Sequence, residues 1–385
     1  MTNPAPDLSP LPLPQGIRAR VVRGVNGLQM HLLEAGHAGK PCLLLLHGFP
    51  ELAYSWRKLM PRLADAGYHV IAPDQRGYGR TTGWDTRYDA DLLPFGMMNL
   101  VRDAVALLDA LGLVRIAGVI GHDFGSPVAA WCALQRPDRF AAVALMSAPF
   151  AGPPSGVPSS EIHAELAALP RPRKHYQAHY GTRGANAEML HGPQGLHAFL
   201  RAYYHMKSAD WPGNRPYPLQ GWRADELAKM PAYYVMDLDL GMAETVAPHL
   251  PTPAQVAAHR WLPDDELAVY SVEFARTGFQ GGLQWYRCSS DARCVAELQA
   301  FAGRTIDVPA CFIAGAADWG MFQKPGELDR MQQQACTAWR GTHVVPGAGH
   351  WVQQERPEAT ARLLLDFLRG AASYNDGVND NKGRA

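Results

Sequence analysis

The chain has no excess of charge of either sign, because its 385 residues include 36 lysines and arginines against 36 aspartates and glutamates. Proteins that bind nucleic acid or an anionic membrane surface usually carry a clear basic excess. The charge balance therefore argues against both partners, and we expect the partner to be a small, uncharged molecule.

The chain also lacks a long hydrophobic run. Apolar stretches such as residues 43–46 have the length of a strand and are too short to span a bilayer. The N-terminal MTNPAPDLSPLPLPQG has neither the basic start nor the apolar region of a secretory leader. We therefore expect a soluble protein with no membrane anchor and no signal peptide.

Paired cysteines are absent as well. The six cysteines are scattered, and none forms a CxxC pair with histidines at metal-ligand spacing. Buried, reduced thiols explain this distribution best and indicate the cytoplasm. We expect no bound metal. The six residues are Cys42, Cys132, Cys288, Cys294, Cys311 and Cys336.

What the first part of the chain does contain is an alternation of strand and helix patterns. Residues 18–23 and 28–34, separated by Asn26-Gly27, are typical of a β-hairpin. Apolar runs at 41–48, 69–74, 116–121 and 142–146 are typical of strands buried on both faces. Residues 97–111 have helical spacing and end at Gly112. This alternation predicts a mostly parallel, doubly wound α/β sheet.

The alternation stops between about residues 150 and 303, where Tyr, Trp, His and Pro are frequent and only helical patterns occur. Strand patterns return at 310–315 and 342–345, with helices around 327–335 and 357–368. We therefore expect an α/β core at residues 16–150 and 304–370 and an inserted helical cap at 151–303. The proline-rich segment 1–15 and the polar segment 371–385 are expected to be disordered tails.

Gly121-His122-Asp123-Phe124-Gly125 has the small-x-nucleophile-x-small form of a strand-to-helix nucleophile elbow. Small residues flank the nucleophile because a Cβ there would collide with neighbouring chain. The central residue is Asp123 rather than the more familiar serine, and Ser126 lies outside the central position. An isolated Asp could simply cap a helix, but the residues around Asp123 favour a nucleophile.

An elbow of this kind requires an acid and then a histidine later in the chain. Asp318 follows the predicted strand at 310–315, and His350 follows the strand at 342–345. A lone Asp or His in a loop is usually only solvated. Two of them in the required order, at the predicted ends of the two final strands, indicate that Asp318 orients His350 and that His350 acts as a base.

His47-Gly48-Phe49-Pro50 follows the first buried strand. Its loop can direct the Phe49 N–H toward Asp123, and together with the Phe124 N–H this gives two oxyanion donors. Phe49-Pro50 is also a candidate cis peptide bond. The alternative is that this motif is only a tight turn.

HGFPE, DQRGYG, GHDFG, the Asp after CFIAG and GHW together resemble the epoxide hydrolase branch of the α/β-hydrolase superfamily. The resemblance covers about residues 18–370 and is weakest between about 211 and 260. HGFPE and DQRGYG are shared with dehalogenases and indicate the branch only loosely. The resemblance implies an α/β-hydrolase fold with a cap, and an epoxide opened through an alkyl ester on Asp123 that is then hydrolysed. It implies neither a metal nor an organic cofactor.

The cap adds two tyrosines. FQGGLQWYR is similar to the segment in which epoxide hydrolases carry one ring-opening tyrosine, here Tyr286. His175-Tyr176-Gln177 is similar to the segment with the other, here Tyr176, and Tyr180 is a competing assignment. The alternative is that these tyrosines only pack the cap. We expect the substrate pocket to be lined by His47, Pro50, Trp285 and Trp351.

Other functions fit these residues less well. Haloalkane dehalogenases generally place Trp directly after the nucleophile to hold the halide, and fluoroacetate dehalogenases place arginines there, whereas this chain has Phe124 and Gly125. An ester or lactone hydrolase would need a serine at position 123. A non-catalytic binding protein would have lost a triad member, and none is missing. We therefore expect a small, apolar epoxide as the substrate, with the dehalogenases as the main alternative.

Overall fold

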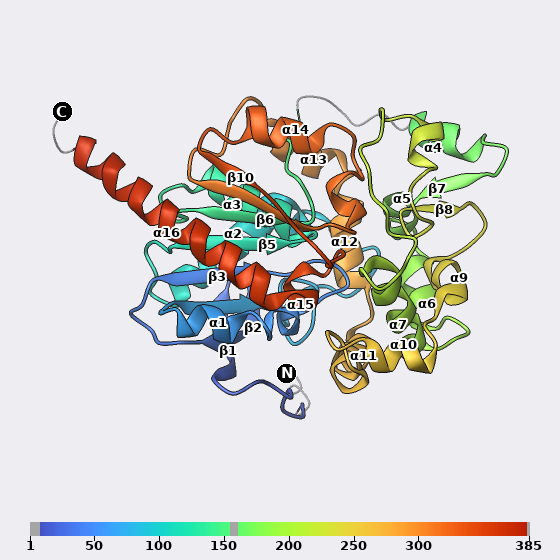
Figure 1. Ribbon diagram of the computed structural model, residues 1–385, viewed down its shortest axis with the longest axis horizontal. Helices are drawn as coiled ribbons and strands as arrows, with labels where there is room; N and C mark the ends of the chain where they lie inside the picture. The colour runs from blue at the N-terminus through green and yellow to red at the C-terminus, as the bar shows by residue number, and fades with distance from the viewer. Residues whose placement is uncertain (1–7, 155–160, 383–385) are drawn as a thin grey trace.

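A central eight-stranded sheet organises the chain, in the order β1-β2-β4-β3-β5-β6-β9-β10 (Figure 1). The computed structural model describes residues 8–154 and 161–382, with side chains as far as residue 375. The strands of this sheet are β1 (Ile17–Val25), β2 (Leu28–Ala35), β3 (Cys42–Leu46), β4 (His69–Pro73), β5 (Gly118–His122), β6 (Val143–Met146), β9 (Ala310–Gly315) and β10 (Trp339–Val345).

The sheet begins with the predicted hairpin. Asn26 and Gly27 have φ angles of 47° and 82°, the left-handed conformation that a two-residue Asn-Gly turn requires. β1 pairs antiparallel with β2, and β2 pairs antiparallel with β4. All other neighbours in the sheet are parallel. The prediction of a mostly parallel α/β-hydrolase sheet is therefore confirmed.

Helices cover both faces of the sheet, and β3 shows why its sequence is a continuous apolar run. Alternate side chains of a strand point to opposite faces. Leu44 and Leu46 pack with α2 (Met97–Ala110) and α3 (Gly125–Gln135) in one core. Leu43 and Leu45 pack in the other core with α1 (Met60–Asp65) and α16 (Pro357–Lys382). Of the short helices, η1 (Ala53–Trp56) and α15 (Val352–Glu355) add side chains to this second core, whereas η2 (Leu93–Phe95) packs in the first.

Between β6 and β9 the chain forms a mainly helical unit beside the carboxyl edge of the sheet, in green to orange in Figure 1. We keep the name cap for residues 151–303. Its helices are α4 (Glu161–Ala167), α5 (Tyr176–Tyr180), α6 (Ala185–Leu190), α7 (Leu196–Lys207), α8 (Ala224–Leu227), α9 (Met242–Val246), η3 (Ala247–His249), α10 (Pro253–Ala258), α11 (Asp264–Thr277), α12 (Gln280–Cys288) and α13 (Ala292–Gln299).

The cap also contains a feature that the sequence did not indicate. β7 (Arg173–His175) and β8 (Val235–Asp237) form a two-stranded antiparallel sheet. Strands of three residues are too short to show an alternating pattern, and their pairing joins segments about 60 residues apart. The helix expected around 327–335 is present as α14 (Glu327–Arg330) followed by a π-helical turn, η5 (Met331–Ala335). η4 (Trp319–Met321) precedes it.

The two expected disordered tails need correction. Residues 8–15 lie against the core, where Leu11 and Leu13 pack on buried side chains and the Tyr54 hydroxyl donates to the Pro12 carbonyl at 3.2 Å. Segment 371–382 continues helix α16; within it Ala371 is buried and the Asn375 amide donates to the Ala141 carbonyl. Residues 1–7 and 383–385 lie outside the described part of the chain. No helix within the described residues is long and apolar enough to cross a membrane.

Candidate active site

A sharp turn between β5 and α3 presents Asp123. Its φ of 51° is left-handed, which is unusual for a residue other than glycine. The flanking glycines are needed because a Cβ on Gly121 would lie 2.0 Å from the Gly125 carbonyl oxygen, and one on Gly125 would lie 2.1 Å from the Leu46 carbonyl oxygen. A Cβ on Gly48 would lie 2.3 Å from the Cβ of Asp123. The turn thus has the form of the predicted elbow.

The structure brings Asp123, His350 and Asp318 together from the ends of three strands. Nε2 of His350 lies 3.1 Å from Oδ2 of Asp123, and Nδ1 of His350 donates to Oδ1 of Asp318 at 3.0 Å. The backbone N–H of Gly320 also donates to Oδ1 of Asp318, at 2.7 Å. The side chains of His350 and Asp318 are each 1% exposed, whereas that of Asp123 is 10% exposed. Of these three side chains, Asp123 is therefore the one that a substrate can reach.

Both carboxylates are held in their charged form. Burial by itself raises the pKa of Asp123, but the hydrogen bond with His350 and the positive charge of Lys207 act in the opposite direction, and the net pKa lies well below its ordinary value. Burial likewise raises the pKa of Asp318, and the charge and hydrogen bond of His350 reverse that effect. Asp123 is accordingly ionised at neutral pH, as a nucleophile has to be.

The backbone N–H of Phe49 donates to Oδ1 of Asp123 at 2.8 Å. The Phe49-Pro50 peptide bond is cis, as expected for this motif. Phe124, the other expected donor, directly follows Asp123 and is the N-cap residue of α3. The Phe49 N–H thus contacts Oδ1 of Asp123, while Oδ2 of Asp123 faces His350.

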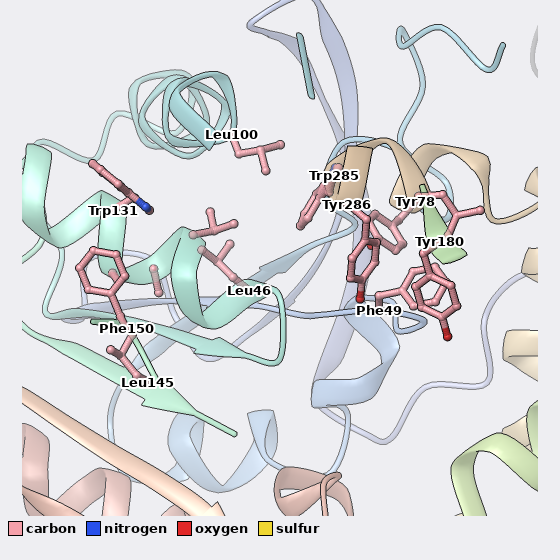
Figure 2. Packing of buried hydrophobic residues seen from close by; sticks show 14 of the residues in the cluster. Leu46, Phe49, Tyr78, Leu100, Trp131, Leu145, Phe150, Tyr180, Trp285 and Tyr286 are labelled. Carbon is pink, nitrogen blue, oxygen red and sulfur yellow. The ribbon is translucent and has the colours of Figure 1, made fainter. Parts of the chain in front are cut away.

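Tyr286 of α12 and Tyr176 of α5 lie over this site. The Tyr286 ring packs 5.5 Å from Phe49 and 5.1 Å from Phe124, and the Tyr176 ring is 6.0 Å from that of Tyr286, centroid to centroid. Figure 2 shows Tyr286 beside Phe49, with Trp285 and Tyr180 as neighbours. Burial, and then the negative charge of Asp123, raise the pKa values of both phenols well above 10. Both remain neutral and can donate a proton.

The hydroxyl groups distinguish the three candidate tyrosines. The Tyr176 hydroxyl donates to Oε1 of Gln323 at 3.1 Å and accepts from Nε2 of Gln177 at 3.1 Å. The Tyr180 hydroxyl instead donates to the Tyr203 hydroxyl at 3.3 Å. Among residues 8–154 and 161–375, no side chain or backbone group is hydrogen-bonded to the Tyr286 hydroxyl. Its proton is therefore free for a bound molecule.

Two of the expected pocket residues serve the framework of the first loop. Nδ1 of His47 lies 2.9 Å from the Gly48 carbonyl oxygen, and Nε2 accepts from the backbone N–H of Gln75 at 3.1 Å. The Pro50 carbonyl accepts from the Tyr204 hydroxyl at 2.9 Å. These polar atoms hold the loop that carries Phe49 and are not available to a ligand.

The two expected pocket tryptophans have their indole N–H groups occupied as well. Trp285 donates to the Arg76 carbonyl at 3.1 Å, and Trp351 donates to the Tyr204 carbonyl at 2.9 Å. Trp285 packs edge-on against Phe124, with a centroid distance of 5.2 Å. Both side chains are almost fully buried. They form walls behind the site rather than polar contacts within it.

A buried pair that the sequence analysis missed supports both loops of the site. Oε2 of Glu51 lies 2.6 Å from Nδ1 of His122, whose Nε2 lies 2.7 Å from the His350 carbonyl oxygen. Both partners are acceptors, so His122 donates from both nitrogens and is positively charged. Burial lowers the pKa of His122, but the charge of Glu51, its hydrogen bond and the charge of Asp123 together outweigh burial, so that the pKa is raised. Both residues lie inside motifs already recognised, HGFPE and GHDFG.

Glu355 of α15 is a second missed residue. Its carboxylate accepts from the backbone N–H groups of Gly349 at 2.9 Å and Trp351 at 3.0 Å, which flank His350, and from that of Ala209 in the cap at 2.9 Å. The Glu355 carboxylate thus fixes the backbone on both sides of His350 and links this loop to the cap. Glu355 is thus expected to be a positioning residue for His350.

Glu355→Gln should slow the step that depends on His350 and lower the free energy of unfolding by about 1–3 kcal/mol, since an amide cannot satisfy all three buried N–H groups. Urea unfolding and single-turnover kinetics measure the two effects. Glu358→Gln, which changes an exposed glutamate on the next helix, is the matched control and should be nearly silent. Equal behaviour of the two variants would remove this role from Glu355.

The described residues contain no group of three or more His, Cys, Asp or Glu side chains arranged to hold a metal ion. All six cysteines are free and buried.

Comparison with known proteins agrees with this geometry. The model of the α/β hydrolase fold family matches residues 41–357, and the chain belongs to this family. Epoxide hydrolase A of Mycobacterium tuberculosis is 38% identical over 350 residues, which cover 90% of this chain and 95% of the relative. Epoxide hydrolase B of the same organism is 35% identical over 342 residues, 86% of this chain and 92% of the relative. Within the fold family, the chain therefore belongs with the epoxide hydrolases.

Solved structures agree. Epoxide hydrolase A from Mycobacterium thermoresistibile superimposes with a TM-score of 0.75 at 35% identity, covering 92% of this chain and 98% of the other. Epoxide hydrolase I of potato gives a TM-score of 0.72 at 30% identity, covering 92% of this chain and 99% of the other.

Proposed function

We propose that the protein hydrolyses small, apolar epoxides to vicinal diols, with Asp123 as the nucleophile. The observation that carries the proposal is the placement of two neutral phenols, Tyr286 and Tyr176, over an ionised Asp123. An epoxide needs this combination, because its oxygen becomes an alkoxide as the ring opens and requires a proton from the side opposite the nucleophile. The relatives reported above carry the same activity in their names.

In the first step, Oδ2 of Asp123 attacks one ring carbon while Oδ1 stays on the Phe49 N–H. The bond between that carbon and the epoxide oxygen breaks, and the oxygen takes the phenolic proton of Tyr286 or Tyr176. The product is an alkyl ester of Asp123 that carries the first hydroxyl of the diol.

In the second step, Nε2 of His350, oriented by Asp318, takes a proton from water, and the hydroxide attacks the ester carbonyl carbon of Asp123. The Phe49 and Phe124 N–H groups hold the oxyanion, and one such donor contributes roughly 10²–10³ in rate. The ester bond breaks, and His350 gives its proton to the leaving alkoxide. Asp123 is then a carboxylic acid, and its proton returns to the phenolate that formed in the first step. Epoxide and water are thereby converted to diol.

The indole contacts argue against a dehalogenase. A haloalkane dehalogenase holds the departing halide with an indole N–H, but Phe124 has none, and the indole of the adjacent Trp285 already donates to a carbonyl. Products from a panel of styrene-type, aliphatic and terpenoid epoxides, 1-haloalkanes and fluoroacetate test the proposal. We expect diol formation without halide release. Halide release without diol would assign the site to the dehalogenases.

The proposal includes the organisation and location of the protein. Residues 16–150 and 304–370 form the catalytic core, and residues 151–303 are the cap that supplies the ring-opening phenols. The six free, buried thiols support a location in the cytoplasm, where thiols stay reduced.

Tyr286→Phe and Tyr176→Phe should each slow ester formation, and the double variant should lose about 10²–10⁴-fold, the usual contribution of general acid catalysis. We expect Tyr286→Phe to have the larger single effect, because the Tyr176 proton is engaged by Gln323. Rapid-quench measurement of the first step with each variant checks this order. Tyr180→Phe, whose hydroxyl points to Tyr203, is the matched control and should form the ester at nearly the normal rate.

A further inference from the structure

Lys207, the last residue of α7, is a buried cation in an aromatic cage. Its residue is only 3% exposed, and Nζ lies 5.2 Å from the ring centroid of Tyr234, 5.4 Å from those of Tyr203 and Trp351, and 6.0 Å from that of Tyr233. No carboxylate oxygen in the described part of the chain lies within the 4.0 Å of an ion pair with Nζ. Lys207 is thus a buried cation whose neighbours are ring faces and the Tyr203 hydroxyl rather than a carboxylate.

Such a charge is costly to bury without an ionic partner. Aromatic faces offset part of that cost through cation–π attraction. An apolar side chain of similar length, such as methionine, would fill the same cage at no electrostatic cost. A buried charge retained under these conditions is a candidate for a functional role.

The cage contacts the loop that carries the proposed base. The backbone N–H of His350 donates to the Lys207 carbonyl at 2.8 Å, and the ring of Trp351, the next residue, is one of the four cage walls. The ammonium group also acts on the nucleophile. After burial, which raises the pKa of Asp123, and the opposing hydrogen bond from His350, the charge of Lys207 is the next largest influence and lowers that pKa.

The other charged side chains around the site lie next to partners of opposite charge or hydrogen-bonding groups. His122 is positive, and its partner Glu51 is negative. Asp318 is negative and hydrogen-bonded to His350. While Asp123 is ionised, its negative charge balances the positive charge of Lys207. The titratable groups that face Lys207, Asp123 and His350 are Tyr203, Tyr233, Tyr234, Tyr176, Tyr286, Tyr78, His122, Glu51 and Asp318.

We propose that Lys207 is an electrostatic positioning residue that acts through Asp123 and His350 in turn; this inference rests on the proposed function. Before attack, its positive charge favours the ionised form of the Asp123 carboxylate, together with His350 and His122. Ester formation removes the negative charge of Asp123, so that the positive charge of the Lys207 ammonium group is no longer balanced by this carboxylate. It then disfavours a proton on Nε2 of His350 and keeps that nitrogen available to take a proton from water.

The test compares the hydrolysis step in Lys207→Met, Lys207→Arg and the wild-type protein across a range of pH, using single turnovers with styrene oxide. In Lys207→Met, the positive charge that disfavours protonation of the base is absent during hydrolysis of the ester. The acid limb of the hydrolysis rate should therefore move up by about one pH unit, with about a tenfold slower rate below the limb. Lys207→Arg keeps the charge and should keep the position of the limb. Lys229→Met, which removes an exposed lysine of the cap, should change neither.

Thermal unfolding supplies the second readout. Because Lys207→Met removes a buried, unpaired charge, its melting temperature should stay equal to or exceed that of the wild type. Slower turnover with a lower melting temperature and an unmoved limb would show that Lys207 only fills the cage, and the inference would fail. A limb that moves equally in Lys207→Arg or in Lys229→Met would also overturn it.

The same assay separates this inference from the proposed function. A wild-type protein that forms and hydrolyses an adduct on the Asp123 peptide, together with an unmoved limb in Lys207→Met, rejects only the role of Lys207. A wild-type protein that forms no adduct rejects the proposed function itself.

Discussion

Asp123→Ala is expected to abolish diol formation, with a loss of about 10⁴–10⁶-fold, the range found when residues of a covalent catalytic unit are removed. The reason is geometric as well as chemical. The elbow places one side chain next to both the Phe49 N–H and Nε2 of His350, and alanine offers no oxygen to form the ester. Product analysis after a single turnover with excess protein measures this loss.

Ser126→Ala is the control for this experiment. Ser126 is the only hydroxyl residue close to the elbow in sequence, and its hydroxyl donates to the Ala148 carbonyl at 2.6 Å rather than to the site. This variant should retain turnover. If Asp123→Ala still produced diol at nearly the normal rate, the covalent mechanism would be wrong, and a protein that only binds epoxides would be excluded as well.

His350→Gln is expected to trap the alkyl ester. Attack by Asp123 precedes the activation of water, so the variant should complete the first step and stop before the second. Mass spectrometry after incubation with an epoxide should find the peptide that contains Asp123 heavier by the mass of one substrate molecule. The wild-type protein, which turns the ester over, should show little of this adduct at the end of the reaction.

A double variant, Asp123→Ala with His350→Gln, separates the ester from unspecific alkylation. It should carry no adduct on that peptide, since the carboxylate that forms the ester is absent. Unspecific alkylation of cysteines and of the other histidines should be the same in both variants, because those residues are unchanged. An unmodified Asp123 peptide in His350→Gln, under conditions where wild type makes diol, would contradict the order of the two steps.

The sequence predicted those parts of the structure that depend on short-range patterns. The parallel strands are continuous apolar runs because both of their faces are buried, and β9 was predicted to the residue. The elbow could be recognised because only glycine fits at 121 and 125, where a Cβ would meet backbone at about 2 Å. Asp318 and His350 followed from strand ends, since parallel strands bring their carboxyl ends to one edge.

The remaining features depend on contacts between distant segments, which no local pattern reveals. Tyr176 and Tyr180 lie one helical turn apart, so spacing alone could not decide which hydroxyl faces the site. Glu355 and Lys207 act on the His350 loop from α15 and α7, and neither residue lies in a motif. The tail after residue 370 is polar in composition, yet α16 continues into it, with Ala371 buried and the Asn375 amide bonded to the Ala141 carbonyl.

The most direct test of the account is a single turnover in H₂¹⁸O with the protein in excess over a styrene-type epoxide. If Asp123 is the nucleophile, water attacks the ester carbonyl, so the first diol keeps an oxygen from the protein and the Asp123 peptide gains one ¹⁸O. If instead the diol carries ¹⁸O after the first turnover and the Asp123 peptide stays unlabelled, water has attacked the epoxide directly, and the covalent role of Asp123 is disproved.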